Sequence, residues 1–371
     1  MRFIISSGLI VFSIGLNSQT KNLKEIEILG RKNSIELKSK NEGFQILEGK
    51  KNETIILSNS VSNKTTNNVR QIMSKIAGLN IWELDGSGIQ VGVSTRGLSP
   101  NRSWEFNTRQ NGYDMSADVF GYPEAYYNPP MEAVERIEFI RGSSALQYGP
   151  QFGGILNYIL KRAKSDKPIN FEGNLTVGSY GLAGLYTAIG GNIKKWNYYF
   201  YNQMRKADGW RENGYYDTRN THGFIQYKIN EATSISAEYT NSNYLLQQSG
   251  GLTDLEYNAN PSRSYRSRNW FSTPWQLANL KYENRIDSNF RIQISATALW
   301  GERSSVGYLA PANKLDTINL STHQYNARQV DRDYYRNLGL EWRNLWNYKL
   351  GHQKQDLAFG LRAYMAHTDR N

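Results

Sequence analysis

Arginine and aromatic side chains recur in several stretches of the sequence where an anionic organic ligand could bind. Guanidinium groups present fixed forks of hydrogen-bond donors that match oxygen anions, and Trp and Tyr rings pack against the organic body of a ligand. Plain solvation, or contact with the phosphates of a lipid surface, is the alternative role for the basic residues. We predict that ligand contacts lie among seven residues: Arg102, Trp104, Tyr122, Tyr126, Arg205, Arg211 and Arg266.

Residue types that carry out catalysis or bind metals do not form convincing patterns. The chain contains no cysteine, and its four histidines, at positions 222, 323, 352 and 367, lack metal-ligand spacing. The glycines at positions 86 and 88 are not followed by the helix that dinucleotide binding needs. We therefore predict that the protein is not an enzyme, has no cofactor and does not itself ligate a metal ion.

The N-terminus predicts export. Residues 1–18 combine a charged start at Arg2 with an apolar stretch from Phe3 to Leu16, which is typical of a secretory signal peptide. After it we find no apolar run long enough to span a bilayer as a helix. A net charge of +11 could suit nucleic acid. Export and the lack of a dense Lys/Arg run favour anionic lipid headgroups or an anionic ligand instead, so we predict no nucleic-acid partner.

Residues 41–165 have the pattern of an α+β domain. Apolar residues at helical spacing predict a helix over residues 69–76, capped by Thr66 or Asn67 and ended by Gly78. Strands are predicted at residues 79–82 and 89–96. A strand, a glycine turn, a short polar helix and a second strand follow over residues 134–159.

From residue 166 the sequence changes to long amphipathic strands. We predict nine: near residues 170–177, 182–190, 196–205, 221–229, 233–242, 276–285, 290–300, 334–347 and 355–368. Alternation of apolar and polar residues predicts an apolar outer face and a wet inner face, although a soluble sandwich would show the same alternation. After the second strand, short turns alternate with long loops, which is typical of an outer-membrane barrel.

Two segments of the α+β region are similar to a known family. Residues 147–158, Q-Y-G-P-Q-F-G-G-I-L-N-Y, resemble the end of the plug domain in TonB-dependent outer-membrane receptors, most of all the ferric dicitrate type. The order of helix, A-G-L-N-I-W strand, glycine-rich turn and R-G-L over residues 67–98 is also similar to that plug. The resemblance implies a plug domain at residues 41–165, followed by an antiparallel transmembrane β-barrel. Residues 166–371 would supply about nine of its 22 strands, which implies an N-terminal fragment.

The resemblance also implies site residues outside the ligand contacts. Arg96 in R-G-L and Arg141 in I-R-G are expected to bridge plug and barrel, by pairing with wall carboxylates such as Glu238 or Glu341. Contact with an anionic chelate is the alternative role of Arg96. A segment within the linker at residues 19–40 resembles the TonB box, which can add as a strand to the sheet of TonB. Its residues are Glu25, Ile26, Glu27, Ile28 and Leu29.

The function that follows from this resemblance is active import of a ferric chelate, citrate-like or another siderophore, across the cell outer membrane. The chelate already fills the coordination shell of the iron, so no protein ligand to iron is expected. The implied partners are TonB, the chelate and outer-membrane lipid or lipopolysaccharide. Two alternatives remain: import of haem, cobalamin or a glycan, and a passive or adhesive outer-membrane barrel.

Overall fold

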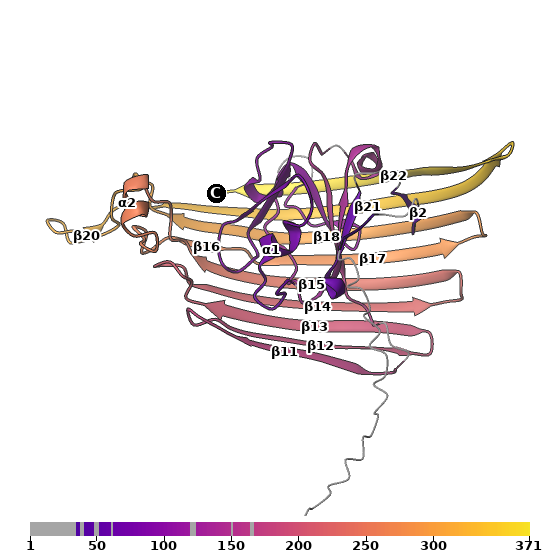
Figure 1. The fold of residues 1–371 in the computed structure, drawn as a ribbon, viewed down its shortest axis with the longest axis horizontal. Helices are drawn as coiled ribbons and strands as arrows, with labels where there is room; N and C mark the ends of the chain where they lie inside the picture. Colours follow the sequence, from indigo (N-terminus) through magenta and orange to yellow (C-terminus); the bar gives the residue numbers. More distant parts are fainter. Residues whose placement is uncertain are drawn as a thin grey trace, which may run out of the picture. The chain divides into compact units, whose positions relative to one another are not determined.

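The structure, a computed structural model, describes residues 35–37, 41–47, 52–60, 62–118, 124–149, 151–163 and 167–371, all within one compact unit. The predicted signal peptide, the predicted TonB box and Tyr122 lie outside the described residues. Two main sheets stand out in Figure 1. The smaller belongs to the plug, which here means the described residues from 35 to 163. The larger, from residue 170 onward, is called the wall.

The plug contains a six-stranded mixed sheet in which β10 runs antiparallel to β9 and parallel to β7. The strand order is β1 (Ile35–Leu37), β4 (Glu53–Ile56), β9 (Val134–Ile140), β10 (Gly154–Leu160), β7 (Phe106–Gln110), β8 (Tyr113–Asp114). Two hairpins are formed by β2 (Asn41–Glu42) with β3 (Gln45–Ile46), and by β5 (Leu79–Glu83) with β6 (Val91–Thr95). The helices are α1 (Val69–Met73), η1 (Leu57–Asn59), η2 (Asn101–Ser103) and η3 (Gly142–Tyr148). The predicted strand, helix and strand over residues 134–159 are confirmed as β9, η3 and β10.

The helix α1 begins at Val69 as predicted, but it ends at Met73, three residues earlier than predicted, and its cap also differs. The helix cap is Asn68, whose side chain accepts a hydrogen bond from Gln71 N at 2.8 Å. Asn67 is buried instead and has a positive φ of 57°. Its amide donates to Ser87 O at 2.8 Å and accepts from Met131 N at 2.9 Å. Asn67 therefore joins three plug segments, which is a structural role that its cap-like sequence context did not indicate.

The wall is an antiparallel sheet that confirms the nine predicted strands. Its members are β11 (Asn170–Val177), β12 (Ala183–Ile193), β13 (Trp196–Ala207), β14 (Tyr216–Lys228), β15 (Thr233–Gln247), β16 (Trp270–Ser272), β17 (Trp275–Arg285), β18 (Phe290–Gly307), β21 (Gln329–Leu350) and β22 (Gln353–Arg370). The one strand that was not predicted, β16, is a short piece. It is separated from β17 at Thr273-Pro274, because proline cannot donate to a strand ladder. The helix α2 (Asp254–Ala259) and the hairpin of β19 (Ile318–Asn319) and β20 (Gln324–Tyr325) lie in connections between wall strands.

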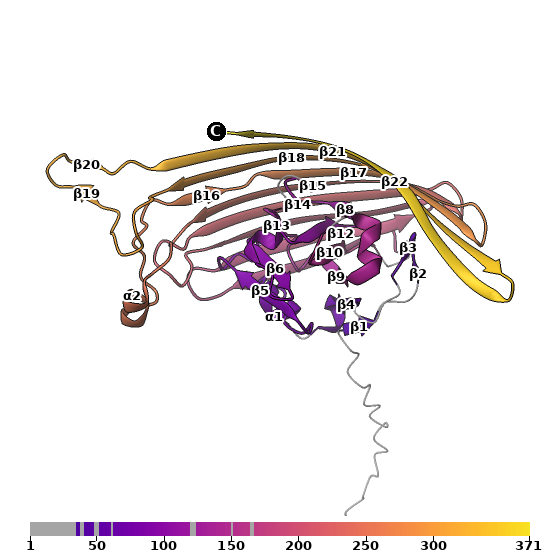
Figure 2. The same cartoon turned by 90° about the horizontal axis from the view of Figure 1, so that it is seen from above.

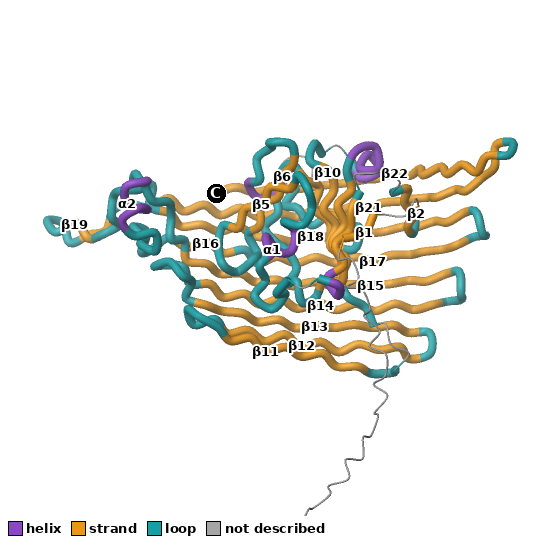
Figure 3. The backbone as a smooth tube through the Cα atoms, viewed as in Figure 1, coloured by secondary structure: helices purple, strands orange, loops and turns teal. Residues whose placement is uncertain are grey.

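The connections of the wall alternate in length, as predicted (Figure 3). Residues 194–195, 229–232, 286–289 and 351–352 form short turns at one end of the sheet, the short-turn end. Residues 208–215, 248–269 and 308–328 form longer connections at the opposite end, the long-loop end. Several strands extend further toward the long-loop end than their apolar pattern predicted, so these loops are shorter than expected.

The two faces of the wall differ in exposure and polarity. On β21, Leu338, Leu340 and Trp342 point outward and are 51%, 50% and 41% exposed. Asn337, directly before Leu338, points inward, is buried and donates to Ala117 O of the plug at 2.6 Å. Figure 2 shows the plug against this inner face. The predicted alternation of an apolar outer face and a polar inner face is therefore confirmed. Among the described residues, no helix has the length and apolar character needed to cross a membrane.

Candidate ligand-binding site

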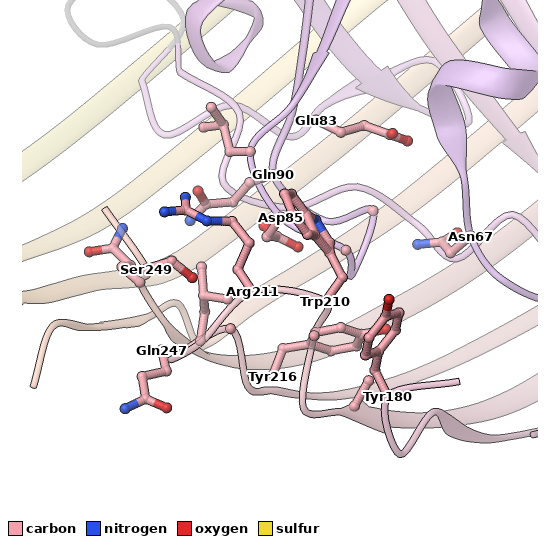
Figure 4. Close-up of a pocket in the computed structure, with 18 of the residues that line it drawn as sticks. Asn67, Glu83, Asp85, Gln90, Tyr180, Trp210, Arg211, Tyr216, Gln247 and Ser249 are labelled. Atoms are coloured by element: carbon pink, nitrogen blue, oxygen red, sulfur yellow. The ribbon is translucent and has the colours of Figure 1, made fainter. Parts of the chain in front are cut away.

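A cavity of about 830 Å³ lies where the plug meets the long-loop end of the wall. On the plug side it is lined by residues within 66–70 and 83–90 and by Arg102. On the wall side it is lined by residues within 179–182, 207–216 and 246–250 and by Asn269. Figure 4 shows side chains of both sides converging on it. We call this space the outer cavity.

The plug side of the outer cavity is formed by a tightly held loop between β5 and β6. A Cβ added at Gly88 would lie 2.1 Å from Asn67 O, so only glycine allows this close approach. Asp85 accepts hydrogen bonds from Ser87 N at 2.6 Å and from the Tyr244 hydroxyl of β15 at 2.7 Å. Burial raises the pKa of Asp85 above its ordinary value, while these hydrogen bonds oppose the rise. The loop is therefore fixed to both the plug and the wall.

The wall side supplies aromatic rings and an arginine. Tyr180 and Trp210 line the cavity and are 60% and 53% exposed, so their rings are available to a ligand. Arg211 donates to Gly250 O at 2.7 Å and to Arg263 O at 2.8 Å. These two bonds hold its guanidinium group at the cavity and fasten the β13–β14 connection to the neighbouring loop.

The charged groups that line the outer cavity are three arginines and two carboxylates, a formal excess of one positive charge. Two of these arginines pair with carboxylates: Arg70 lies 3.6 Å from Glu83, and Arg102 lies 2.7 Å from Glu124. Arg211 bonds backbone carbonyls instead, so its charge is not neutralised by those contacts. The side chain of Gln90 is 4% exposed, and its Nε2 has no hydrogen-bond partner among the described residues. These donors suit a ligand with oxygen acceptors.

The structure brings only part of the predicted ligand set to this cavity. Arg102 and Arg211 line it. Trp104 is 48% exposed but is not among the lining residues. Tyr126 is 1% exposed, and its ring stacks on Tyr335 of the wall at 6.0 Å. Ligand contact by any of these residues stays a prediction, but the burial of Tyr126 favours a packing role.

Two further arginines of the predicted set have protein partners at other places. Arg205 is 3% exposed and bridges from β13 to the plug, with its Nη2 2.7 Å from Thr65 O and 3.0 Å from Glu132 Oε2. Arg266 donates to the backbone carbonyls of Ala310 and Pro311, at 2.5 and 2.9 Å, in the β18–β21 connection. Sequence spacing placed both near long loops, but it did not show that one supports the plug and the other supports the loops.

The ion pair that joins the plug to the wall carboxylate Glu341 is made by Arg109. The Arg109 side chain is fully buried, 3.1 Å from Glu341 and 3.0 Å from Asp114. The residues expected to pair with such carboxylates make other contacts within the plug: Arg96 donates to Phe152 O at 3.0 Å, and Arg141 lies 2.7 Å from Glu53. Arg109, which the sequence analysis did not single out, thus makes the contact with Glu341 that was expected of Arg96 or Arg141.

The second wall carboxylate named from the sequence, Glu238, is also at the plug interface. Its Oε2 accepts a hydrogen bond from the Asn111 amide of the plug at 2.5 Å. Lys281 of β17 donates to Asn111 O at 3.0 Å.

Among the described residues, no group of three or more His, Cys, Asp and Glu side chains could hold a metal ion.

The comparisons with known proteins agree with this architecture. Residues 47–155 match the family model of the TonB-dependent Receptor Plug Domain. The ferric citrate transporter FecA in its unliganded form is 19% identical with a TM-score of 0.73, and the match covers 88% of this chain and 48% of FecA. The ferripyoverdine receptor of Pseudomonas aeruginosa is 14% identical with a TM-score of 0.67, covering 86% and 42%. The siderophore receptor PiuA from Acinetobacter baumannii is 15% identical with a TM-score of 0.65, covering 90% and 48%.

Residues 47–155 therefore match a plug domain, and the chain shares the plug-and-wall fold of the three receptors named above. The predicted fold class is confirmed. The chain spans less than half the length of the three receptors named above.

The site contains residues that sequence reasoning missed, notably Asp85, Gln90, Tyr180 and Trp210. Asp85 lies in the glycine-rich turn that resembles the plug pattern and lacks the helix needed for dinucleotide binding; no ligand contact was predicted for it. Tyr180 lies in the tight connection between β11 and β12, and Trp210 lies next to the predicted Arg211. The enrichment of aromatic residues near predicted loops could have indicated Trp210 as a cavity residue. No sequence pattern indicated Gln90.

Proposed function

We propose that the protein is part of an outer-membrane receptor that imports a ferric chelate with energy supplied through TonB. The observation that carries this proposal is the outer cavity. Its volume of about 830 Å³ falls in the range of pockets that hold organic ligands. Its position between the plug and the long-loop end gives a ligand access from the side that faces the medium in a barrel of this type.

The chemistry of the lining supports an oxygen-rich, anionic chelate of the citrate type or another siderophore. Arg211 and Gln90 offer hydrogen-bond donors, while Tyr180 and Trp210 offer ring surfaces. The lining also contains Asp85, so its positive excess is small. A chelate of modest negative charge fits this balance better than a highly charged one. The iron would keep the ligands of the chelate, and the protein would bind the organic shell.

Energy coupling and location rest on the sequence. Residues 25–29 alternate apolar and charged side chains, a pattern that suits strand addition to TonB. Residues 1–18 have the features of a signal peptide, and the apolar outer face of the wall suits outer-membrane lipid or lipopolysaccharide. FecA is described as a ferric citrate transporter and PiuA as a siderophore receptor, which supports the same class of ligand here.

Binding to the outer cavity can be measured through the tryptophan fluorescence of the purified protein, expressed from its complete gene, with Trp210→Phe identifying the contribution of Trp210 among the nine tryptophans of this sequence. The probes are ferric dicitrate, ferrichrome, haem and cobalamin. We expect one ferric chelate to bind, and Arg211→Ala to weaken it about tenfold, because a charge-assisted hydrogen bond is lost. Arg266→Ala is the matched control, since Arg266 also fastens loops through carbonyls but does not line the cavity. Binding of haem or cobalamin alone, or equal losses in both variants, would argue against the proposal.

A further inference from the structure

The outer cavity has a counterpart near the other end of the same wall strands. A second cavity, of about 350 Å³, lies between the plug and the parts of β11, β12 and β13 that are closer to the short-turn end. We call it the lower cavity. On β13, Ala207 lines the outer cavity and Tyr199 lines the lower one. Both residues face inward, and the eight residue steps from one to the other correspond to about 26 Å along a strand.

Three inward-facing residues of β13 separate the two cavities. Arg205 is the first below the outer cavity, and its Nη2 bonds Thr65 O and Glu132 of the plug. The next is Gln203, and the third is Tyr201, whose ring stacks on His222 of β14 at 5.4 Å. The Arg205–Glu132 ion pair is therefore the closure nearest to the outer cavity.

Below this ion pair, the wall amides bond each other rather than the plug. Asn220 of β14 donates to Gln203 Oε1 at 2.7 Å, and both residues are almost fully buried. Gln203 Nε2 and Asn220 Oδ1 have no hydrogen-bond partner among the described residues. One donor and one acceptor thus face the plug unsatisfied, which is costly in a closed interface. A hydrated chelate at this position would satisfy both.

The two cavities also share a charge balance. Among the residues that the structure describes, five charged side chains line the lower cavity: Lys64, Lys161, Arg162, Glu135 and Glu172. They give one excess positive charge, the same formal balance as in the outer cavity. The two cavities at the ends of the inner face of β13 therefore suit a ligand of the same weakly anionic character.

We propose that the ligand crosses the protein along the inner faces of β13 and β14, from the outer cavity to the lower cavity, and that the Arg205–Glu132 ion pair closes the outer end of this route. The inference rests on the proposed function, because a route has meaning only for a transporter. It adds which wall strands the ligand passes and which contact must open first.

Thiol labelling can test the route because the chain contains no cysteine. Asn220→Cys places a thiol on the route, and Asn337→Cys places one on β21, where Asn337 bonds the plug. Both positions are buried. Cells that express the complete gene are treated with a charged, membrane-impermeant maleimide, with and without ferric dicitrate or the chelate that binds best. We expect uptake to speed labelling of Asn220→Cys about tenfold, as the open population rises, and to leave Asn337→Cys slow.

The outcomes separate the route from the proposed function. If the parent shows no uptake of any iron chelate, the proposed function fails and the route falls with it. If uptake proceeds while Asn220→Cys stays unlabelled, or while both thiols react equally, the route is wrong and the function stands. Uptake by each cysteine variant shows that the variant has folded. Thr218→Cys is a second reporter of the route, because Thr218 is also buried and faces inward on β14.

The closing contact has its own test in the Asn220→Cys protein. Removing the carboxylate by Glu132→Gln should raise labelling without any ligand, because the Arg205–Glu132 ion pair no longer holds the plug to β13. Glu124→Gln is the matched control, since Glu124 also pairs with an arginine but both partners belong to the plug. Equal labelling of the Glu132 and Glu124 variants would overturn the assignment of Arg205–Glu132 as the closure.

Discussion

The plug is held differently at β21–β22 and at β13–β14. Toward β21 and β22, the buried Arg109 lies between Asp114 and Glu341, and the neighbouring strands add Arg343 to Glu341 and Arg362 to Asp114. These groups form one connected network of opposite charges. Moving the plug away from this side would break several of these ion pairs at once, so this side should resist separation.

Toward β13 and β14 the contact is sparser. Arg205 bonds Glu132 and Thr65 O, but Gln203 and Asn220 bond each other. Opening this side exposes two amide groups to water that would satisfy them, whereas opening the other side separates several buried ion pairs. The difference indicates that the plug is anchored at β21–β22 and can be released at β13–β14.

The largest effect is expected for Arg109→Leu. The substitution removes the two buried ion pairs that Arg109 makes, while Asp114 and Glu341 both keep Arg362 as a partner. It should cost about 3 kcal/mol, because a hydrogen bond to a charged group contributes about 1.5–3 kcal/mol. Chemical unfolding of the purified protein, followed by proteolysis of the plug, measures this loss. Arg219→Leu, which removes an exposed arginine beside Asp217 on the outer face, is the control and should leave the unfolding midpoint unchanged. Similar unfolding midpoints for both variants would show that the ion pairs of Arg109 do not anchor the plug.

An effect of intermediate size on the unfolding free energy is expected from the buried amides, and it should differ between the two sides of the plug. Asn337→Leu deletes the donor to Ala117 O and should cost about 1–3 kcal/mol of unfolding free energy, because that carbonyl is left unsatisfied. The double variant Gln203→Met with Asn220→Leu removes both partners of one bond and should change the free energy by less than about 1 kcal/mol. If the double variant is the less stable one, the amides of β13 and β14 contribute more to closure than we infer.

The smallest effect is a pH dependence at Glu132. Burial raises its pKa to about 7, against the opposing charges of Arg205 and Lys161. Because the folded state then holds the proton more tightly than the unfolded state, the contribution of Glu132 to stability falls as the pH rises from about 4.5 toward 7. Unfolding midpoints at several pH values should therefore fall less steeply in Glu132→Gln than in the parent. Parallel slopes would show that Glu132 does not titrate in this range.

Much of the fold could be predicted from the sequence because its signals are local. Alternation along residues 290–300 and 334–347 located the wall strands, and turn residues located their short connections. Boundaries were less accurate where strands continue past the apolar pattern, as β21 does over Gln329–Leu350. The break between β16 and β17 was missed, although Pro274 marks it, because the flanking residues were assigned to one long loop.

The site was less predictable because it depends on which wall residues face the plug and on how far along each strand they lie. Alternation along β13 could have placed Arg205 on the inner face, but it could not show that Glu132 lies opposite. Arg109 occurs in F-N-T-R-Q, which reads as an ordinary polar strand, yet tertiary packing buries it completely. Gln90 lines the outer cavity through a hairpin turn whose geometry no local pattern specifies.

Energised import is the central claim, and uptake of radiolabelled iron tests it most directly. Cells that express the complete gene, with or without residues 25–29, receive the ferric chelate that binds to the outer cavity. We predict that the deletion reduces the initial uptake rate to that of cells lacking the protein, while binding to the purified protein is unchanged. Uptake that continues at the parental rate after the deletion would contradict energised import.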